Sequence, residues 1–174
     1  PADAFGVAAL SDAERLRAAG EIKRIVLLSG PDEAADISRL RDLQVDIVIH
    51  HESQLRLLSE AGAGDSLRVW LKIDTGMSRL GFAASQAMEV YRWLRECRHV
   101  DPDIVCMTHF ACSDEFAKNM TSAQIQRFAE ALDGADCVRS MANSAAVLGW
   151  PQSHAQWIRP GGALYGLSSV EVRT

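Results

Sequence analysis

Two basic residues in the stretch VWLKIDTGMSRLG could take part in chemistry. Lys72 lies inside an apolar run, and Arg79 follows an Asp-Thr-Gly turn. An ammonium inside such a run faces a low-dielectric interior, so it needs a partner or a modification. A guanidinium seven residues further on can reach the same site and fork onto a phenolate or a carboxylate. The alternatives are a lysine that snorkels out of a strand end and an ordinary surface arginine.

A histidine, His109, ends the apolar run IVCMTHF. As a neutral imidazole it can accept a hydrogen bond from an arginine and fix the plane of that guanidinium, although a satisfied structural histidine is the alternative. Cys106 and Cys112 flank it, but a zinc site needs a fourth ligand, and Cys106 and His109 point to opposite faces of a strand. We therefore expect no metal, and buried free cysteines of a reducing compartment.

Two further stretches suit a phosphate group. Asn143 and Ser144 follow an apolar run and begin a short helix pattern, whose free N–H groups attract anions, although plain helix capping explains the same residues. Arg159 closes another run and is followed by Gly161 and Gly162, where the backbone can approach a ligand closely and donate N–H groups. Phosphate loops on the last two strands are common in barrel enzymes.

The elements that must position these residues alternate between apolar runs and amphipathic helix patterns. The runs are AFGVA (4–8), IVLLS (25–29), DIVIH (46–50), RVWLKID (68–74), IVCMTHF (104–110), CVRSMAN (137–143) and WIRPGGALYG (157–166). Helix patterns include 11–19, where Ser11 and Glu14 form a capping-box pattern, 84–97 and 121–132. Because no GxGxxG follows the first run, we expect a parallel (β/α)8 TIM-type barrel rather than a doubly wound sheet. Seven strands leave it one strand short of closure.

Composition limits the class of protein. A chain of 174 residues with 48% hydrophobic and 24% charged residues is typical of one globular domain, which would bury roughly 70% of its unfolded surface. The net charge is −5, and the basic residues are spread along the chain, so nucleic acid is not an expected partner. No signal-peptide pattern or membrane-length apolar run occurs, and we expect a cytoplasmic protein.

Four motifs together resemble the alanine racemase family in order and spacing. They are LKIDTGMSRLGF (71–82), THFACSDE (108–115), MANSAA (141–146) and IRPGGALYG (158–166), and ADAFGVA (2–8) is similar to the second strand of that family's barrel. The resemblance covers essentially the whole chain. It implies that 1–174 is a partial N-terminal barrel that binds pyridoxal 5'-phosphate, with the first strand and the C-terminal β domain of the family missing.

The resemblance also implies roles for single residues. Lys72 matches a lysine that is often carbamylated, which would turn a costly cation into an anion that orients Arg79. Arg79 matches the arginine that contacts the phenolic oxygen of the cofactor and the substrate carboxylate. His109 matches the histidine that supports the pyridine-facing arginine, and Arg159 matches that arginine.

Four more positions match the surroundings of the cofactor phosphate: Asn143, Ser144, Gly161 and Gly162. Ser144 is the best candidate for a side-chain contact. The family commonly carries a bulkier apolar residue where Gly162 stands, and the backbone donor survives that difference.

Both proton-transfer groups of the family are unmatched. No segment of the KANAYGHG type, which carries the cofactor lysine, occurs in the sequence, and the catalytic tyrosine belongs to the β domain. Lys72 and Lys23 stand in the wrong motifs to replace that lysine, and Tyr165 is expected inside an apolar strand with a structural role. We therefore expect a fragment, inactive alone, of a homodimeric racemase that interconverts L- and D-alanine, for peptidoglycan synthesis or for alanine catabolism.

Two alternatives stay open on the sequence. One is a non-catalytic pyridoxal-phosphate carrier of the small homeostasis-protein type, which has the same kind of barrel and no β domain. The LKIDTGM and THFACSDE motifs oppose it. The other is an isolated barrel piece without function, whose unpaired strand edge leaves it marginally stable.

Overall fold

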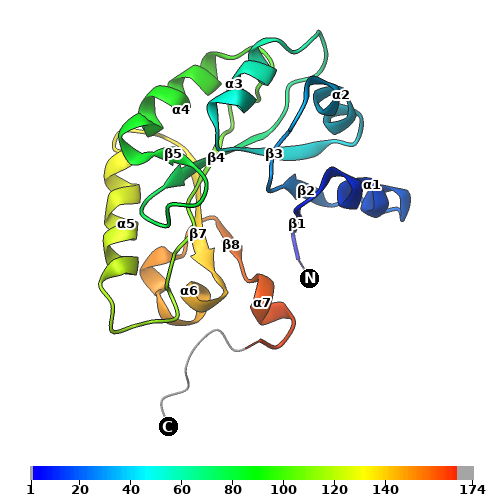
Figure 1. The fold of residues 1–174 in the computed structure, drawn as a ribbon. Helices are drawn as coiled ribbons and strands as arrows, with labels where there is room; N and C mark the ends of the chain where they lie inside the picture. The colour runs from blue at the N-terminus through cyan, green and yellow to red at the C-terminus, as the bar shows by residue number, and fades with distance from the viewer. Residues whose placement is uncertain (1, 168–174) are drawn as a thin grey trace. The chain divides into compact units, whose positions relative to one another are not determined.

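The computed structural model describes residues 2–167, and all its strands belong to one sheet with parallel pairing (Figure 1). The strands are β1 (Ala4–Val7), β2 (Arg24–Leu27), β3 (Val45–Ile49), β4 (Val69–Asp74), β5 (Phe82–Ala83), β6 (Val105–Met107), β7 (Val138–Asn143) and β8 (Trp157–Arg159). Their order is β1-β2-β3-β4-β6-β7-β8, with the short β5 paired to β4. A doubly wound sheet reverses its order at a switch point, whereas this order follows the chain. The predicted class, a parallel α/β fold of the incomplete-barrel type, is confirmed.

Helices alternate with these strands and begin close to the predicted positions. They are α1 (Leu10–Ala18), α2 (Ala34–Asp42), α3 (Glu52–Ser59), α4 (Ala87–Glu96), α5 (Met120–Ala131), α6 (Ser144–Gly149) and α7 (Gly161–Leu164), with 3-10 turns at Ala84–Gln86 and Pro151–Ser153. The capping box predicted at Ser11 and Glu14 is wrong. The N-cap of α1 is Ala9, which has no side-chain cap, because Ser11 already lies within the first helical turn.

The last predicted strand is also much shorter than expected. β8 ends at Arg159, and residues 161–164 form α7 instead of continuing the strand. Pro160 lies between them, and proline has no N–H to donate to a sheet while its fixed φ favours the start of a helix. Tyr165 therefore follows a helix and is 84% exposed, which corrects its predicted place inside an apolar strand.

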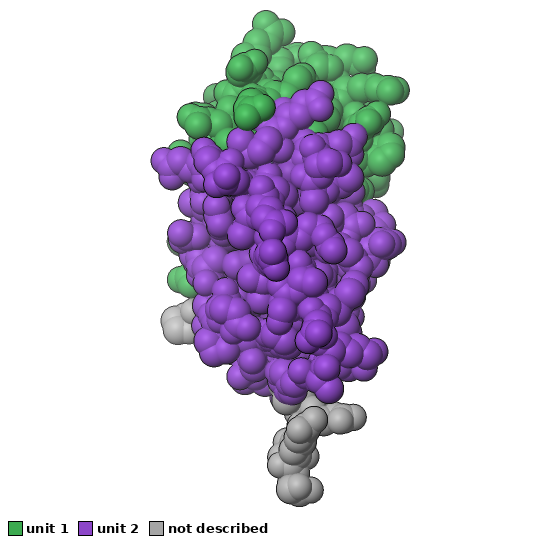
Figure 2. All heavy atoms as spheres, turned by 90° about the vertical axis from the view of Figure 1, so that its left-hand side faces the viewer, with its two compact units in different colours: residues 1–71, 90–104 green, residues 72–89, 105–174 purple. Residues whose placement is uncertain are grey.

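The chain divides into two compact units, which Figure 2 colours separately. Unit 1 comprises residues 1–71 and 90–104, and unit 2 comprises residues 72–89 and 105–174. In unit 1, every residue of β3 is buried, as expected for a parallel strand covered on both faces. In unit 2, the core includes the fully buried rings of Phe110 and Phe128.

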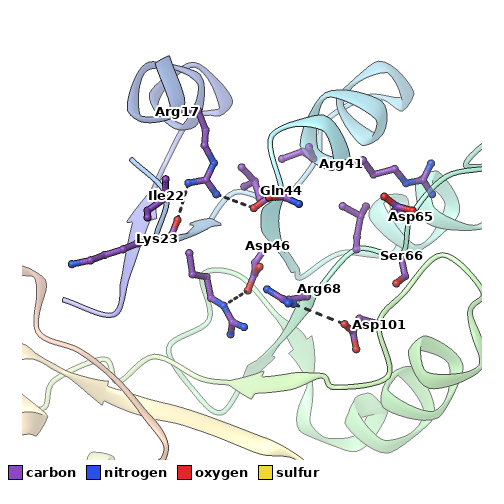
Figure 3. A pocket seen from close by; sticks show the side chains of 14 residues that line it. Arg17, Ile22, Lys23, Arg41, Gln44, Asp46, Asp65, Ser66, Arg68 and Asp101 are labelled. Carbon is purple, nitrogen blue, oxygen red and sulfur yellow. Dashed lines mark hydrogen bonds and ion pairs between the residues drawn. The ribbon is translucent and has the colours of Figure 1, made fainter. Parts of the chain in front are cut away.

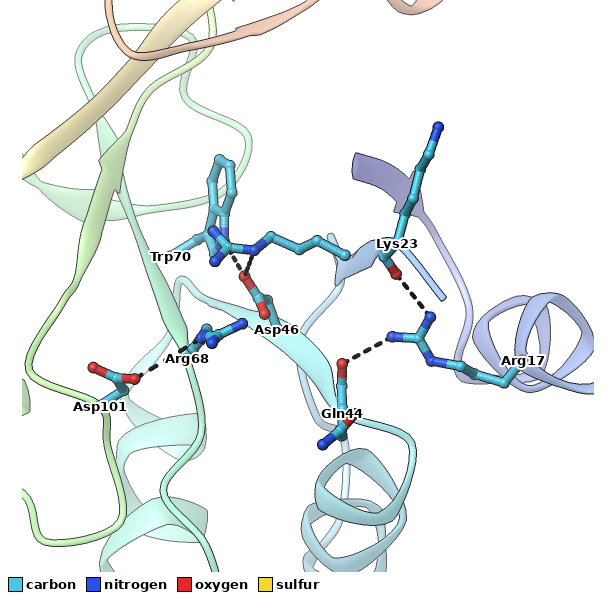
Figure 4. A network of polar contacts seen from close by, with 8 residues as sticks. Arg17, Lys23, Gln44, Asp46, Arg68, Trp70 and Asp101 are labelled. Carbon is cyan, nitrogen blue, oxygen red and sulfur yellow. Dashed lines mark hydrogen bonds and ion pairs between the residues drawn. The ribbon is translucent and has the colours of Figure 1, made fainter. Parts of the chain in front are cut away.

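Unit 1 contains a polar hollow of about 320 Å³ at the beginnings of β2, β3 and β4 (Figure 3). Arg17 donates from its guanidinium to four backbone carbonyls there, among them those of Lys23 and Gln44. Asp46, 3% exposed, accepts the indole N–H of Trp70 at 3.0 Å, and Figure 4 shows this network. Burial raises the pKa of Asp46, although the contact with Trp70 opposes the shift. The network joins the beginnings of β2, β3 and β4 to one another and to α1.

The four cysteines are free thiols. Cys106 is fully buried, as predicted, but Cys97, Cys112 and Cys137 are partly exposed, which corrects the expectation of buried thiols for these three. Within residues 2–167, no group of three or more histidine, cysteine or acidic side chains is arranged to hold a metal ion. In the same residues, no helix combines the length and the apolar character needed to cross a membrane.

Candidate active site

A pocket of about 350 Å³ opens in unit 2 at the carboxyl ends of β6, β7 and β8. Its lining includes six predicted site residues: His109, Asn143, Ser144, Arg159, Gly161 and Gly162. Phe110, Ala111, Ser113, Asp114 and Ala145 complete it. The carboxyl ends of parallel strands lie at the same edge of the sheet. Residues up to 53 positions apart in the sequence therefore meet here.

Arg159, the last residue of β8, is held in a fixed orientation. Its Nη1 donates to Ser140 Oγ at 2.5 Å, and its Nη2 donates to the backbone carbonyls of Thr108 at 2.5 Å and Met141 at 3.2 Å. Desolvation lowers its pKa to about 10, so it still carries a positive charge at neutral pH. Its Nε–H makes no hydrogen bond with any residue in the described part of the chain. The Nε–H is therefore available to a ligand, while the bonds made by the two Nη nitrogens fix the plane of the guanidinium.

His109 lies next to three cations of the same unit. Burial, the largest cause, and the charges of Arg159, Lys72 and Arg79, in that order, together lower the pKa of its imidazole to about 4. With this pKa the ring is neutral at pH 7, the form that can accept a hydrogen bond from an arginine. No hydrogen bond joins it to Arg159 among the described residues, so the predicted support of the guanidinium by this ring stays a prediction.

Lys72 lies in β4 and is 8% exposed, which agrees with a side chain facing the interior. Burial, the largest cause, and the nearby charges of Arg79 and Arg159 together lower its pKa to about 8, while Asp74 opposes the shift. Lys72 forms no ion pair with any carboxylate in the described chain. A lysine crowded by two guanidiniums fits the expectation that it needs a partner or a modification.

The loop after β4 brings Arg79 back toward this strand. Asp74 Oδ1 accepts the N–H groups of Gly76 at 2.9 Å and Ser78 at 3.1 Å, which closes the predicted Asp-Thr-Gly turn. The chain then pairs with β4 again through β5. Gly81, with φ of +125°, makes this return possible, because a Cβ there would lie 2.7 Å from the backbone nitrogen of Asp74. Arg79 is exposed and does not line the pocket.

Asn143 and Ser144 have the structural partners that the capping alternative requires. Asn143 is the N-cap of α6, and its Oδ1 accepts from the N–H of Ala146 at 3.1 Å and from Ser113 Oγ at 2.7 Å. Ser144 Oγ accepts the N–H of Ala163 at 3.1 Å, which ties α6 to α7. The hydroxyl proton of Ser144 is still able to donate into the pocket. Capping and ligand binding are therefore compatible at these positions.

Several residues that orient the site were not singled out in the sequence. Thr108 and Ser140 accept from Arg159, and Gln124 donates to the carbonyl of His109. Thr108 stands within the THFACSDE motif, which is the signal that could have identified it. Nothing in the local pattern around Ser140 or Gln124 marks them, because their partners are distant in sequence.

The fold and the site together define a parallel α/β barrel-type domain with a pocket at its strand ends that is lined by Arg159, His109 and several small polar residues. A family model described as "Alanine racemase, N-terminal domain" matches residues 1–169. The curated alanine racemase of Shewanella amazonensis is 46% identical over 97% of this chain and 46% of its own length. The chain belongs to the alanine racemase family.

Solved structures agree with this assignment. The biosynthetic alanine racemase of Pseudomonas aeruginosa superposes with a TM-score of 0.92 and 39% identity, over 98% of this chain and 48% of that one. The alanine racemase of Bartonella henselae, solved with covalently bound pyridoxal phosphate, shares the fold at a TM-score of 0.81 and 22% identity, over 95% of this chain and 49% of that one. The chain thus spans about half the length of the relatives that it matches.

Proposed function

We propose that the protein containing this chain interconverts L- and D-alanine with pyridoxal 5'-phosphate. We propose further that this chain contributes the pocket for the cofactor phosphate and three charged side chains of the site, those of Lys72, Arg79 and Arg159. The observation that carries the proposal is the pocket in unit 2, which joins Ser144, Gly161 and Gly162 to Arg159 and His109. Membership of the alanine racemase family supports the reaction. Alanine is the proposed substrate.

The residues of the pocket fit a phosphate ester with a pyridine ring. Ser144 supplies a hydroxyl, and a Cβ added at Gly161 would meet nothing within 4 Å, so a ligand can approach that backbone. The Nε–H of Arg159 has no partner among residues 2–167 and is the group that would donate to a ring nitrogen. The pocket therefore has donors for both ends of the cofactor.

These three charged side chains would influence how the α-proton of the substrate leaves and whether racemisation or transamination follows. Pyridoxal phosphate, when bound, withdraws electrons from the α-carbon of the amino acid and weakens its C–H bond. A guanidinium at the ring nitrogen, as proposed for Arg159, keeps that nitrogen unprotonated and limits electron withdrawal, which disfavours transamination. Arg79 would hold the substrate carboxylate, and a carbamate on Lys72 would give Arg79 an anionic partner.

The groups that move the proton are assigned to other parts of the protein. The family resemblance implies a lysine and a tyrosine for this task, and no residue of this chain matches either motif. We therefore expect the isolated 174 residues to be inactive. Homodimer formation, a cytoplasmic location and a role in peptidoglycan or alanine metabolism stay predictions.

Cofactor binding by this chain can be tested by titration with pyridoxal phosphate, followed by the change in cofactor absorbance. Ser144→Ala is expected to weaken binding roughly tenfold, since it removes one charge-assisted hydrogen bond. Ser11→Ala, on an exposed turn of α1, is the matched control. Equal affinities for the two variants would contradict the placement of the phosphate.

The reaction is tested with the full-length protein. D-Alanine should form from L-alanine, and its formation should depend on added pyridoxal phosphate. A folded, full-length protein that binds the cofactor but does not racemise alanine would leave the non-catalytic carrier as the better function.

A further inference from the structure

Gln124, on α5, is a fully buried polar side chain that joins two segments of the site in unit 2. Its Oε1 accepts the N–H of Ala111 at 3.0 Å, and its Nε2 donates to the carbonyl of His109 at 3.1 Å. The same Nε2 donates to Thr75 Oγ1 at 3.1 Å. A backbone N–H only donates and a carbonyl only accepts, so these partners fix which way the amide points.

The contact with Thr75 extends this network to Arg159. Thr75 and Thr108, both fully buried, share a hydrogen bond of 2.8 Å between their hydroxyl oxygens. The carbonyl of Thr108 accepts from Arg159 Nη2. Arg127, one helical turn after Gln124, donates to the carbonyl of Thr75 and holds the same turn. Thr75 begins the loop that leads from β4 to Arg79.

The backbone of this turn approaches α5 too closely for an ordinary side chain. Gly76 has φ of +130°, and a Cβ there would lie 2.8 Å from Arg127 Nη1 and 3.9 Å from Gln124 Cγ. Side chains of the helix are therefore in contact with the turn, and any other residue at position 76 would be strained at this φ and would have to shift the guanidinium of Arg127. Every segment that Gln124 bonds thus leads directly to a residue of the proposed site.

We infer that Gln124 is a positioning residue for the reaction, which sets the places of His109, Arg159 and the loop of Arg79 through its three hydrogen bonds. This inference rests on the proposed function for its kinetic consequence only. A buried apolar side chain would fill the same volume, but it would not fix the orientation of the segments around it. A buried amide costs free energy unless all its bonds are made, so it specifies one arrangement of the two segments.

The test compares Gln124→Met with Gln126→Met in the full-length protein. Methionine keeps the length of glutamine and removes its hydrogen bonds, and Gln126 lies on the exposed side of the same helix, where it donates to Glu130. The first readout is the titration of His109 by NMR, with its signal assigned from a His109→Asn variant. The second is kcat/KM for L-alanine.

We expect Gln124→Met to raise the pKa of His109 from about 4 toward its ordinary value. The released segment would move the ring away from burial and from the charges that face it, Arg159 on β8, Lys72 on β4 and Arg79 after β4. We expect kcat/KM to fall roughly tenfold or more, since misplacements of an ångström cost rate on that scale. Gln126→Met should change neither quantity.

Gln124→Glu serves as a second variant, because it keeps the acceptor for Ala111 but, as a carboxylate, cannot donate to His109 or Thr75. If neither variant folds, Thr75→Val breaks the network at its next link and is expected to lower kcat/KM in the same way. An unchanged His109 titration in folded Gln124 variants, or a kcat/KM for Thr75→Val equal to wild type, would overturn the inference. If the wild-type protein does not racemise alanine, the proposed function fails, and the His109 titration still decides the role of Gln124.

Discussion

Replacing Lys72 by methionine should stabilise this protein at neutral pH, although it removes a residue of the proposed site. The side chain is 8% exposed and lies near two guanidiniums, and its pKa falls from 10.5 to about 8. A shift of this size corresponds to about 3 kcal/mol of unfavourable free energy for the charged form in the folded state. Lys72→Met keeps the length of the side chain without the charge, so the free energy of unfolding at pH 7 should rise by up to about 3 kcal/mol.

The pH dependence gives the sign of this effect. Between pH 8 and 10.5 the unfolded chain binds more protons at Lys72 than the folded chain does, so wild-type stability rises with pH in that window. The methionine variant lacks this contribution, and the gap between the two proteins should close as the pH approaches 10.5. Urea unfolding measures the difference in the free energy of unfolding between the two proteins at pH 7 and at pH 10. The buffer is purged of CO2 to keep the amine of Lys72 unmodified.

Lys118 provides a matched control for this experiment. Its ammonium is solvent-exposed and donates to Glu115 at 2.8 Å, which raises its pKa rather than lowering it. Lys118→Met should therefore give no stabilisation at pH 7. A Lys72→Met protein no more stable than wild type at pH 7, or a gap that is the same at both pH values, would refute the reasoning.

Three further substitutions test how the structure is held. Arg159→Lys should lower the free energy of unfolding by about 1–3 kcal/mol in urea, because an ammonium cannot span the acceptors that the planar guanidinium reaches. Gly149→Ala should cost about 1 kcal/mol, since its Cβ would lie 2.0 Å from Phe116 and displace that ring from its stack on Trp150; unchanged tryptophan fluorescence would contradict this. Asp46→Ala should cost about 1–3 kcal/mol by removing the carboxylate that accepts from Trp70, and calorimetry would show a lower Tm.

Local sequence determined the kinds of element and most of their places. β-Branched apolar runs such as DIVIH and VWLKID form β3 and β4 because side chains buried on both faces leave little choice of conformation. The strand prediction failed at the end of the chain, where the apolar character of a run competed with the stronger effect of a proline. The run 157–166 is apolar enough for a strand, but Pro160 and the glycines after it end the ladder at Arg159 and begin a helix.

The sequence by itself also determined the family, because Lys72, Arg79, His109 and Arg159 stand in short motifs that resemble those of the alanine racemases. Only the tertiary structure decided how strongly they act on one another. The low pKa values of Lys72 and His109 come from burial and from nearby cations, among them Arg159 on β8, which lies 50 or more residues away in the sequence. Gln124 is the clearest case, since its partners lie on a turn and a loop 13 to 49 residues away and meet only when the sheet has formed.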